Sequence, residues 1–156
     1  MNSEALRIAT ELRDAFAGNP WHGSPLSELL EDVDAAQASA RPVASAHTIH
    51  ELVLHIDIWL RAALDATNGI PMPGLGGTEK DWPAAIDDAP STWAATMARL
   101  FEGAEQLAPA IAGFSDERLR DIVPGREYDF YYLFHGIVQH SLYHGGQIAI
   151  LKKAAK

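Results

Sequence analysis

The chain has 156 residues, of which 47% are hydrophobic, and this is enough for one domain with a single apolar core. Its formal net charge of −9 opposes binding to a nucleic-acid backbone, so we expect no nucleic-acid partner. The absence of cysteine excludes disulfides, thiolate metal ligands and a cysteine nucleophile from the chain itself, so any thiol chemistry would use a small external thiol.

The first predicted helix spans residues 3–17, and the sequence GNP at residues 18–20 ends it. Its apolar side chains fall mainly on one face: Leu6, Ile8, Ala9, Leu12, Ala15 and Phe16. The N-terminal segment lacks the basic start and apolar run of a signal peptide. No stretch approaches the ~20 apolar residues of a membrane span. We therefore expect a cytoplasmic protein with no membrane partner.

A shorter accessory helix is predicted for residues 24–38, with Ser24 as N-cap and Pro25 at the first helical position. A long helix follows within residues 47–69. Thr48 and Glu51 have the spacing of a capping box at its start, and Gly69 is a candidate C-cap. Its core stripe contains Ile49, Leu52, His55, Ile56, Trp59 and Ala63.

Residues 69–90 are rich in glycine and proline and predict a long irregular crossover. This loop either covers the open end of the helices and sets substrate choice, or is an ordinary mobile connection. Ser91 is the expected N-cap of a third long helix that ends near Ala112, and residues 115–123 are expected to add a short turn. The last long helix is predicted for residues 128–154, with an apolar stripe of Leu133, Ile137, His140, His144, Ile148 and Leu151.

These elements predict an all-α fold: a four-helix bundle with a long crossover loop and a short accessory helix, forming one domain over residues 1–156. The sequence has no strand-like alternation and no internal repeat. Helix bundles commonly build metal and ligand sites from side chains of facing helices.

Three histidines occupy positions where a bundle core would carry apolar side chains. His140 and His144 differ by roughly 40° around their helix, so both imidazoles lie on one face, one turn apart. His55 lies in the core stripe of another long helix. Burying unpaired imidazoles costs on the order of 1–3 kcal/mol each, which favours a shared reason for their position. We interpret them as ligands of a divalent metal, with hydrogen-bonded core histidines as the alternative.

The other four histidines are not expected to join this group. His50 and His135 each precede a proposed ligand by five residues, a rotation of roughly 140° on a regular helix. His47 precedes the capping box, and His22 lies in a loop. We expect each of them at the surface or in a hydrogen bond.

The segments HELVLHIDIW (50–59) and LFHGIVQHSLYHGGQIAILKKA (133–154) resemble the DinB-like (DinB/YfiT) superfamily of four-helix-bundle metalloproteins. The resemblance covers nearly the whole chain, including PWHGSPLSELLEDV (20–33) and DWP (81–83). In that family, one histidine of the second long helix and two of the last hold a divalent metal. The resemblance therefore implies the ligands His55, His140 and His144.

The resemblance implies a metal-dependent hydrolase or a transferase that uses a small thiol, acting on a small-molecule substrate at an open site. The alternative is a non-catalytic metal-binding or stress-response bundle in which a protein side chain fills the fourth position. Zinc and nickel are the leading metals, with iron and manganese as alternatives. We expect a homodimer, from the habit of the family and from Gly145 and Gly146, which suggest close approach of another helix. No catalytic residue is identified.

Four further side chains lie near the proposed ligands, and three of them have two interpretations each. Glu51 either belongs to the capping box or orients a ligand or moves a proton. Trp59 and Tyr143 either wall a pocket or belong to the core, and Gln147 is a candidate hydrogen-bond partner for a bound ligand.

Overall fold

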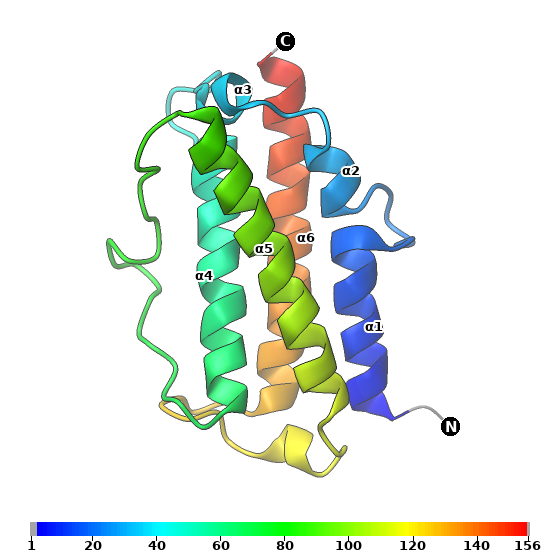
Figure 1. Cartoon of the computed structure of the whole chain (residues 1–156). Coiled ribbons are helices and arrows are strands. Elements are labelled where there is room, and N and C mark those ends of the chain that lie inside the picture. The colour runs from blue at the N-terminus through cyan, green and yellow to red at the C-terminus, as the bar shows by residue number, and fades with distance from the viewer. Residues whose placement is uncertain (1–2, 156) are drawn as a thin grey trace.

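The computed structural model describes residues 3–155. Four long helices make up most of it (Figure 1): α1 (Glu4–Ala17), α4 (Ile49–Thr67), α5 (Pro90–Ala112) and α6 (Phe130–Ala154). The shorter elements are α2 (Leu26–Leu30), α3 (Ala35–Ser39) and the 3₁₀ turn η1 (Arg118–Arg120). The predicted all-α class is confirmed, because the only extended pairing within residues 3–155 is an isolated bridge between Ile122 and Asp129.

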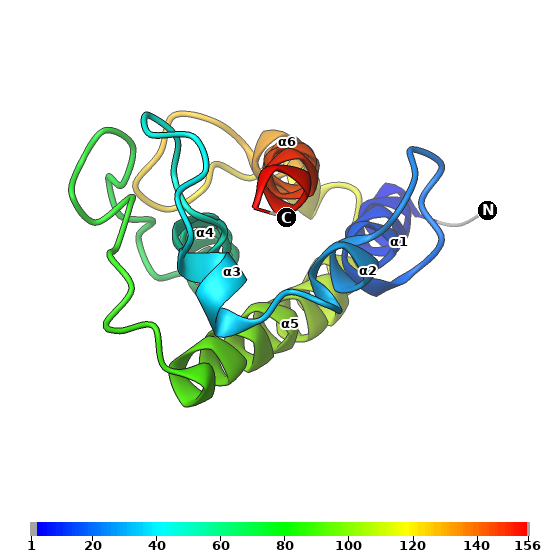
Figure 2. The ribbon, with the colours of Figure 1, turned by 90° about the horizontal axis from the view of Figure 1, so that it is seen from above.

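The four long helices form a closed ring of neighbours, seen end-on in Figure 2. Helix α5 packs against α1 and α4, and α6 packs against the same two helices from the opposite side. The core between them consists of fully buried side chains that include Ile8, Leu12, Ile56, Leu60, Leu100, Leu107 and Phe134. Within the described residues, no helix combines the length and the hydropathy that a membrane crossing needs.

Side chains at the starts of α4 and α6 fix where these helices begin. Thr48 Oγ1 accepts a hydrogen bond from the Glu51 N–H at 3.1 Å, and the Glu51 carboxylate accepts one from the Thr48 N–H at 2.8 Å. This is the predicted capping box. At α6, Asp129 accepts from the Tyr132 N–H at 2.9 Å, so the helix begins at Phe130 rather than at Tyr128.

A buried carboxylate fastens α4 to α5. The side chain of Asp57 is 4% exposed and lies 2.9 Å from Arg61 Nε and 3.0 Å from Arg99, which belongs to α5. The two cations compensate for removing the carboxylate from water, and the pairing holds α4 in a fixed position against α5. It thereby fixes the helix that carries His55.

The prediction of one accessory helix over residues 24–38 is wrong, because the segment forms two short helices. Asp34 accepts a hydrogen bond from the Gln37 N–H at 2.8 Å and starts α3 as its N-cap. The Val33 carbonyl accepts a hydrogen bond from Trp93 Nε1 at 2.7 Å, rather than from a backbone N–H within a continuous helix. Ser24 is not a cap, since α2 begins at Leu26 after Pro25.

The start of α5 also differs from its prediction. Pro90 is the first helical residue and Ala89 is the N-cap, so Ser91 lies inside the first turn. Proline suits this position because its missing N–H would have no helical partner there. The Ala89 N–H is satisfied by the Asp87 carboxylate at 3.0 Å.

The crossover between α4 and α5 is irregular, as predicted, and runs along the outer side of α4 (Figure 1). Gly69 has a φ of +81° and follows Asn68, the C-cap of α4. Further along, Met72 and Leu75 are buried, and the Met72 N–H donates to the Pro124 carbonyl at 2.8 Å. The crossover is therefore packed against the bundle over part of its length.

Candidate metal centre

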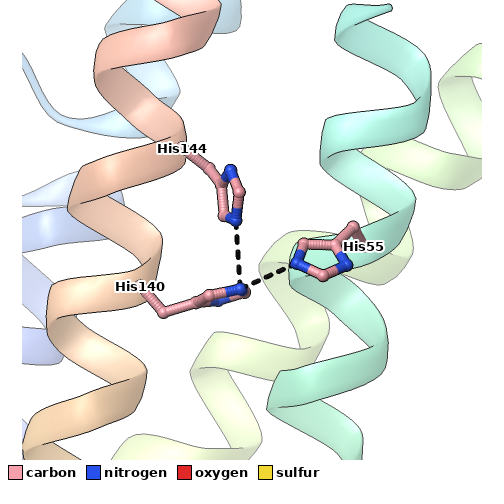
Figure 3. A group of neighbouring side chains, drawn as sticks. All are labelled: His55, His140 and His144. Carbon is pink, nitrogen blue, oxygen red and sulfur yellow. Dashed lines mark hydrogen bonds between the residues drawn. The ribbon is translucent and has the colours of Figure 1, made fainter. Parts of the chain in front are cut away.

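The three histidines selected from the sequence converge between two neighbouring helices (Figure 3). His55 projects from α4, and His140 and His144 project from successive turns of α6. His140 Nε2 lies 2.8 Å from His55 Nε2 and 3.1 Å from His144 Nε2. One nitrogen from each ring falls within 4.8 Å of the other two. Two of the rings are buried and His140 is half-buried.

Hydrogen bonds at the outer nitrogens set the protonation of two of these rings. His55 Nδ1 lies 2.5 Å from the Asp81 backbone carbonyl, which can only accept, so Nδ1 carries the proton. His144 Nδ1 lies 2.6 Å from Gln147 Oε1 and donates to it in the same way. In both neutral rings the lone pair therefore belongs to Nε2, which faces the cluster.

Burial keeps the cluster neutral. Desolvation, followed by the neighbouring His144 and His55, lowers the pKa of His140 from 6.5 to about 3. Desolvation is also the largest cause that lowers the pKa of His55 and of His144, outweighing the nearby Asp81 carboxylate. Imidazoles must be neutral to bind a metal, so these residues are in the binding-competent form at neutral pH.

The donor set fits a divalent ion better than it fits a purely hydrogen-bonded core. The lone pairs of His55 and His144 both face His140 Nε2, and a single N–H there can be well aligned with only one of them. His140 Nδ1 is buried without a hydrogen-bond partner in the described residues. A cation that binds all three Nε2 atoms would resolve this crowding of acceptors.

The crossover loop supports His55 through two consecutive residues. Asp81 accepts on its carbonyl from His55 and on Oδ1 from Trp59 Nε1 at 2.9 Å, and Oδ2 accepts from the Gly77 N–H at 3.3 Å. Trp82 stacks on the His55 ring with 3.8 Å between centroids. The role of Asp81 was not predicted from the sequence, because the pattern of an irregular loop does not reveal which helix it contacts.

A cavity of ≈ 430 Å³ reaches all three histidines. Trp59 and Tyr143 line it, as one interpretation of the sequence expected, together with Asp81, Trp82, Tyr128, Tyr132, Leu133, Gly136 and Ile137. Within residues 3–155, no fourth histidine or carboxylate joins the three histidines as a further ligand. The arrangement therefore combines three nitrogens that could hold a metal ion with adjoining space for a small molecule.

The remaining histidines lie outside the cluster, as predicted. His50 Nε2 is 3.1 Å from Thr96 Oγ1 in the core, and His135 lies 3.8 Å from a Glu4 carboxylate oxygen. His47 stacks on the face of Trp82 with 3.5 Å between centroids, and His22 is exposed.

Glu51 and Gln147 have partners within the protein. Glu51 caps α4 and pairs with Arg41 at 2.8 Å, so its carboxylate serves the helix start rather than the cluster. Gln147 contacts His144 itself, a support that the sequence analysis did not assign.

The two glycines of α6 differ in their surroundings. A Cβ at Gly145 would contact Leu26 at 3.6 Å and Leu29 at 3.7 Å, so α2 approaches α6 closely there, within the chain. A Cβ at Gly146 would meet nothing within 4 Å.

Comparisons with known proteins agree with the resemblance noted in the sequence. A family model described as the DinB superfamily matches residues 21–148, a span that contains His55, His140 and His144. No curated protein and no solved structure matches the chain.

The buried neutral histidines predict an acid sensitivity of the metal-free protein. Because the pKa of His140 is about 3 in the folded state against 6.5 ordinarily, the unfolded chain binds a proton there that the folded chain does not. The free energy of unfolding should therefore fall as the pH drops below 6.5, by about 2 kcal/mol at pH 5 from this residue alone. Urea unfolding of chelator-treated protein between pH 8 and pH 5 measures it.

The substitution His140→Gln should flatten this pH dependence, whereas His22→Gln should leave it unchanged. Equal pH dependence in the parent protein and the His140→Gln variant would contradict the assignment of a buried neutral His140.

Proposed function

The chain belongs to the DinB superfamily, and from this membership together with the three-histidine cluster we propose that it is a metal-dependent enzyme. Its reaction is either hydrolysis of a small molecule or transfer involving a small external thiol. The observation that carries the proposal is the cavity of ≈ 430 Å³ that adjoins all three histidines. A cavity of this size is typical of small-molecule sites.

The proposed ligand atoms are Nε2 of His55, His140 and His144. Zinc and nickel suit three imidazoles, and iron and manganese are also compatible. When bound, such an ion supplies a Lewis acid that keeps its full positive charge and lowers the pKa of a water or thiol.

The protein's own residues would hold and orient this site. The Asp81 carbonyl and the Gln147 side chain keep the Nδ1 protons in place, so that the Nε2 lone pairs point to a common centre. Trp82 covers one face of His55 and limits the rotation of its ring. Trp59 and Tyr143 wall the adjoining cavity and exclude water from part of it.

The alternative is a non-catalytic metal-binding or stress-response bundle. That function requires no cavity at the ion and is best served by a closed site with four protein ligands. The cavity and the three-membered donor set both favour the enzyme.

Metal binding should depend on each of the three histidines. Protein incubated with zinc and then desalted should hold about one ion per chain. Each of the substitutions His55→Ala, His140→Ala and His144→Ala should lower zinc affinity by more than about 100-fold, since even partners behind the ligands contribute about 10–100-fold. Metal analysis and competition with a chromophoric chelator measure both quantities.

His22→Ala is the control and should retain the parent affinity. Zinc should also raise the melting temperature of the parent protein, because the ion binds only the folded chain. Zinc occupancy well below one ion per chain, with the three variants behaving like the control, would establish hydrogen-bonded core histidines instead.

An open coordination position distinguishes the enzyme from the closed metal protein. Cobalt-substituted protein should change its visible absorption when azide or a small thiol is added, because an exogenous ligand can enter the cavity. Two controls accompany this measurement. The variant Tyr143→Ala, altered at the cavity wall, should retain the cobalt. Protein without any metal should show no absorption change when azide or thiol is added. A cobalt spectrum that neither azide nor thiol alters would favour the non-catalytic alternative.

The homodimer expected from the sequence stays a prediction, as does the cytoplasmic location. Gly146 and Ile150 lie on an outer face of α6, and Ile150 is 67% exposed, which suits a contact with a second chain. Sedimentation velocity at micromolar concentration should give twice the mass of a 16.9 kDa chain. A single species with the mass of one chain would contradict it.

A further inference from the structure

Aromatic side chains dominate the cavity beside the histidines. Trp59, Trp82, Tyr128, Tyr132 and Tyr143 line it, with Leu133 and Ile137 between them. Tyr132 and Tyr143 are 67% and 66% exposed although their rings are large and apolar. Exposed aromatic side chains around a hollow of this size are typical of a site that a ligand covers.

The side chains of this cavity offer no free ion-pair partner for a charged group on a ligand. Of the described residues that line it, none is lysine or arginine, and the one carboxylate belongs to Asp81. That carboxylate already accepts from Trp59 Nε1 and from the Gly77 N–H. An anionic group placed among these rings would lose its hydration without gaining an ion pair from a side chain. A cationic ligand would also be repelled by the divalent ion of the proposed function.

Gly136 provides the space in the part of this cavity next to α6. It lies four residues before His140 in the same helix, and a Cβ built on it would meet nothing within 4 Å. Since Gly136 lines the cavity, a larger side chain would project into the hollow. Glycine costs roughly 1 kcal/mol relative to alanine inside a helix, so open space for a ligand is a reason for its presence here.

We propose that this cavity binds an uncharged small molecule through an aromatic ring, and that Gly136 determines whether the ring fits. The ring stacks among the tryptophan and tyrosine side chains, and a polar group at its edge faces the histidines. The inference rests on the proposed function for the chemistry at the histidines, but the ring site itself consists of the chain's own side chains.

Three probes with the same ring system and different charges test the proposal: 2-naphthol, 2-naphthalenesulfonate and 2-naphthylmethylammonium. Titration calorimetry with the full-length protein at pH 7 compares 2-naphthol with the ammonium probe on zinc-loaded protein and with the sulfonate on chelator-treated protein, because a bound divalent ion would itself attract the sulfonate. The neutral 2-naphthol should bind at least about tenfold more tightly than either charged probe. It should also bind the chelator-treated protein, because the ring site does not require the metal.

The matched variants are Gly136→Leu and Gly146→Leu. Both glycines lie in α6 with open space at the Cβ position, but Gly146 lines a different hollow, beside Leu29 and Ala149. Gly136→Leu should lower 2-naphthol affinity by at least about tenfold and leave the zinc content unchanged, whereas Gly146→Leu should leave both the 2-naphthol affinity and the zinc content unchanged. Should Gly136→Leu not fold, Gly136→Ala, which favours the helix, should still lower the affinity measurably.

The outcomes separate the two proposals. Absence of 2-naphthol binding, binding of a charged probe as tightly as the neutral one, or equal affinity in both leucine variants would overturn the ring site. Protein that binds zinc but not 2-naphthol overturns this inference alone. If the protein binds 2-naphthol and Gly136→Leu weakens that binding, but the protein holds no zinc, the ring site is supported and only the proposed function is overturned.

Discussion

Three neutral imidazoles share one small space in this bundle, and the rest of the candidate site depends on that crowding. Two of the rings have their outer nitrogens fixed as donors, by the Asp81 carbonyl and by Gln147, so their inner nitrogens can only accept. The Nε2 atoms of His55 and His144 lie 2.8 and 3.1 Å from His140 Nε2. These lone pairs are stable so close together only if they share one electron-pair acceptor. A divalent ion satisfies all of them at once, whereas one proton does not.

The fold supplies this geometry by making α4 and α6 neighbours although 85 residues separate His55 from His140. The Asp57 ion pairs hold α4 against α5, and the caps at Thr48 and Asp129 fix where the two ligand-bearing helices begin. A helix pair positioned in this way presents its ligands with little reorganisation on metal binding. The crossover loop then adds contacts that the helices cannot provide.

The sequence was sufficient to predict the four long helices and the grouping of the histidines, because both follow from helical periodicity. The i, i+4 spacing of His140 and His144, and the place of His55 in an apolar stripe, are properties of regular helices. The split of residues 24–38 was missed although Asp34 is a residue type that favours the N-cap, because the distant Trp93 that takes the Val33 carbonyl is not visible in the local pattern. The contact of Asp81 with His55 was missed for the same reason: the path of an irregular loop is decided by tertiary packing.

The nearest partner of His55 Nδ1 is the main-chain carbonyl of Asp81 at 2.5 Å, with the carboxylate of the same residue at 3.2 Å. Every amino acid carries that carbonyl, so exchanging the residue at position 81 leaves the nearest acceptor in the chain, although it removes the carboxylate that lies beside His55 and that Trp59 contacts. A change in the number of residues between α4 and position 81 would instead carry the acceptor out of register with the imidazole. During divergence of related chains, the histidine support should thus be lost more readily by insertions and deletions in the crossover than by replacements at this position.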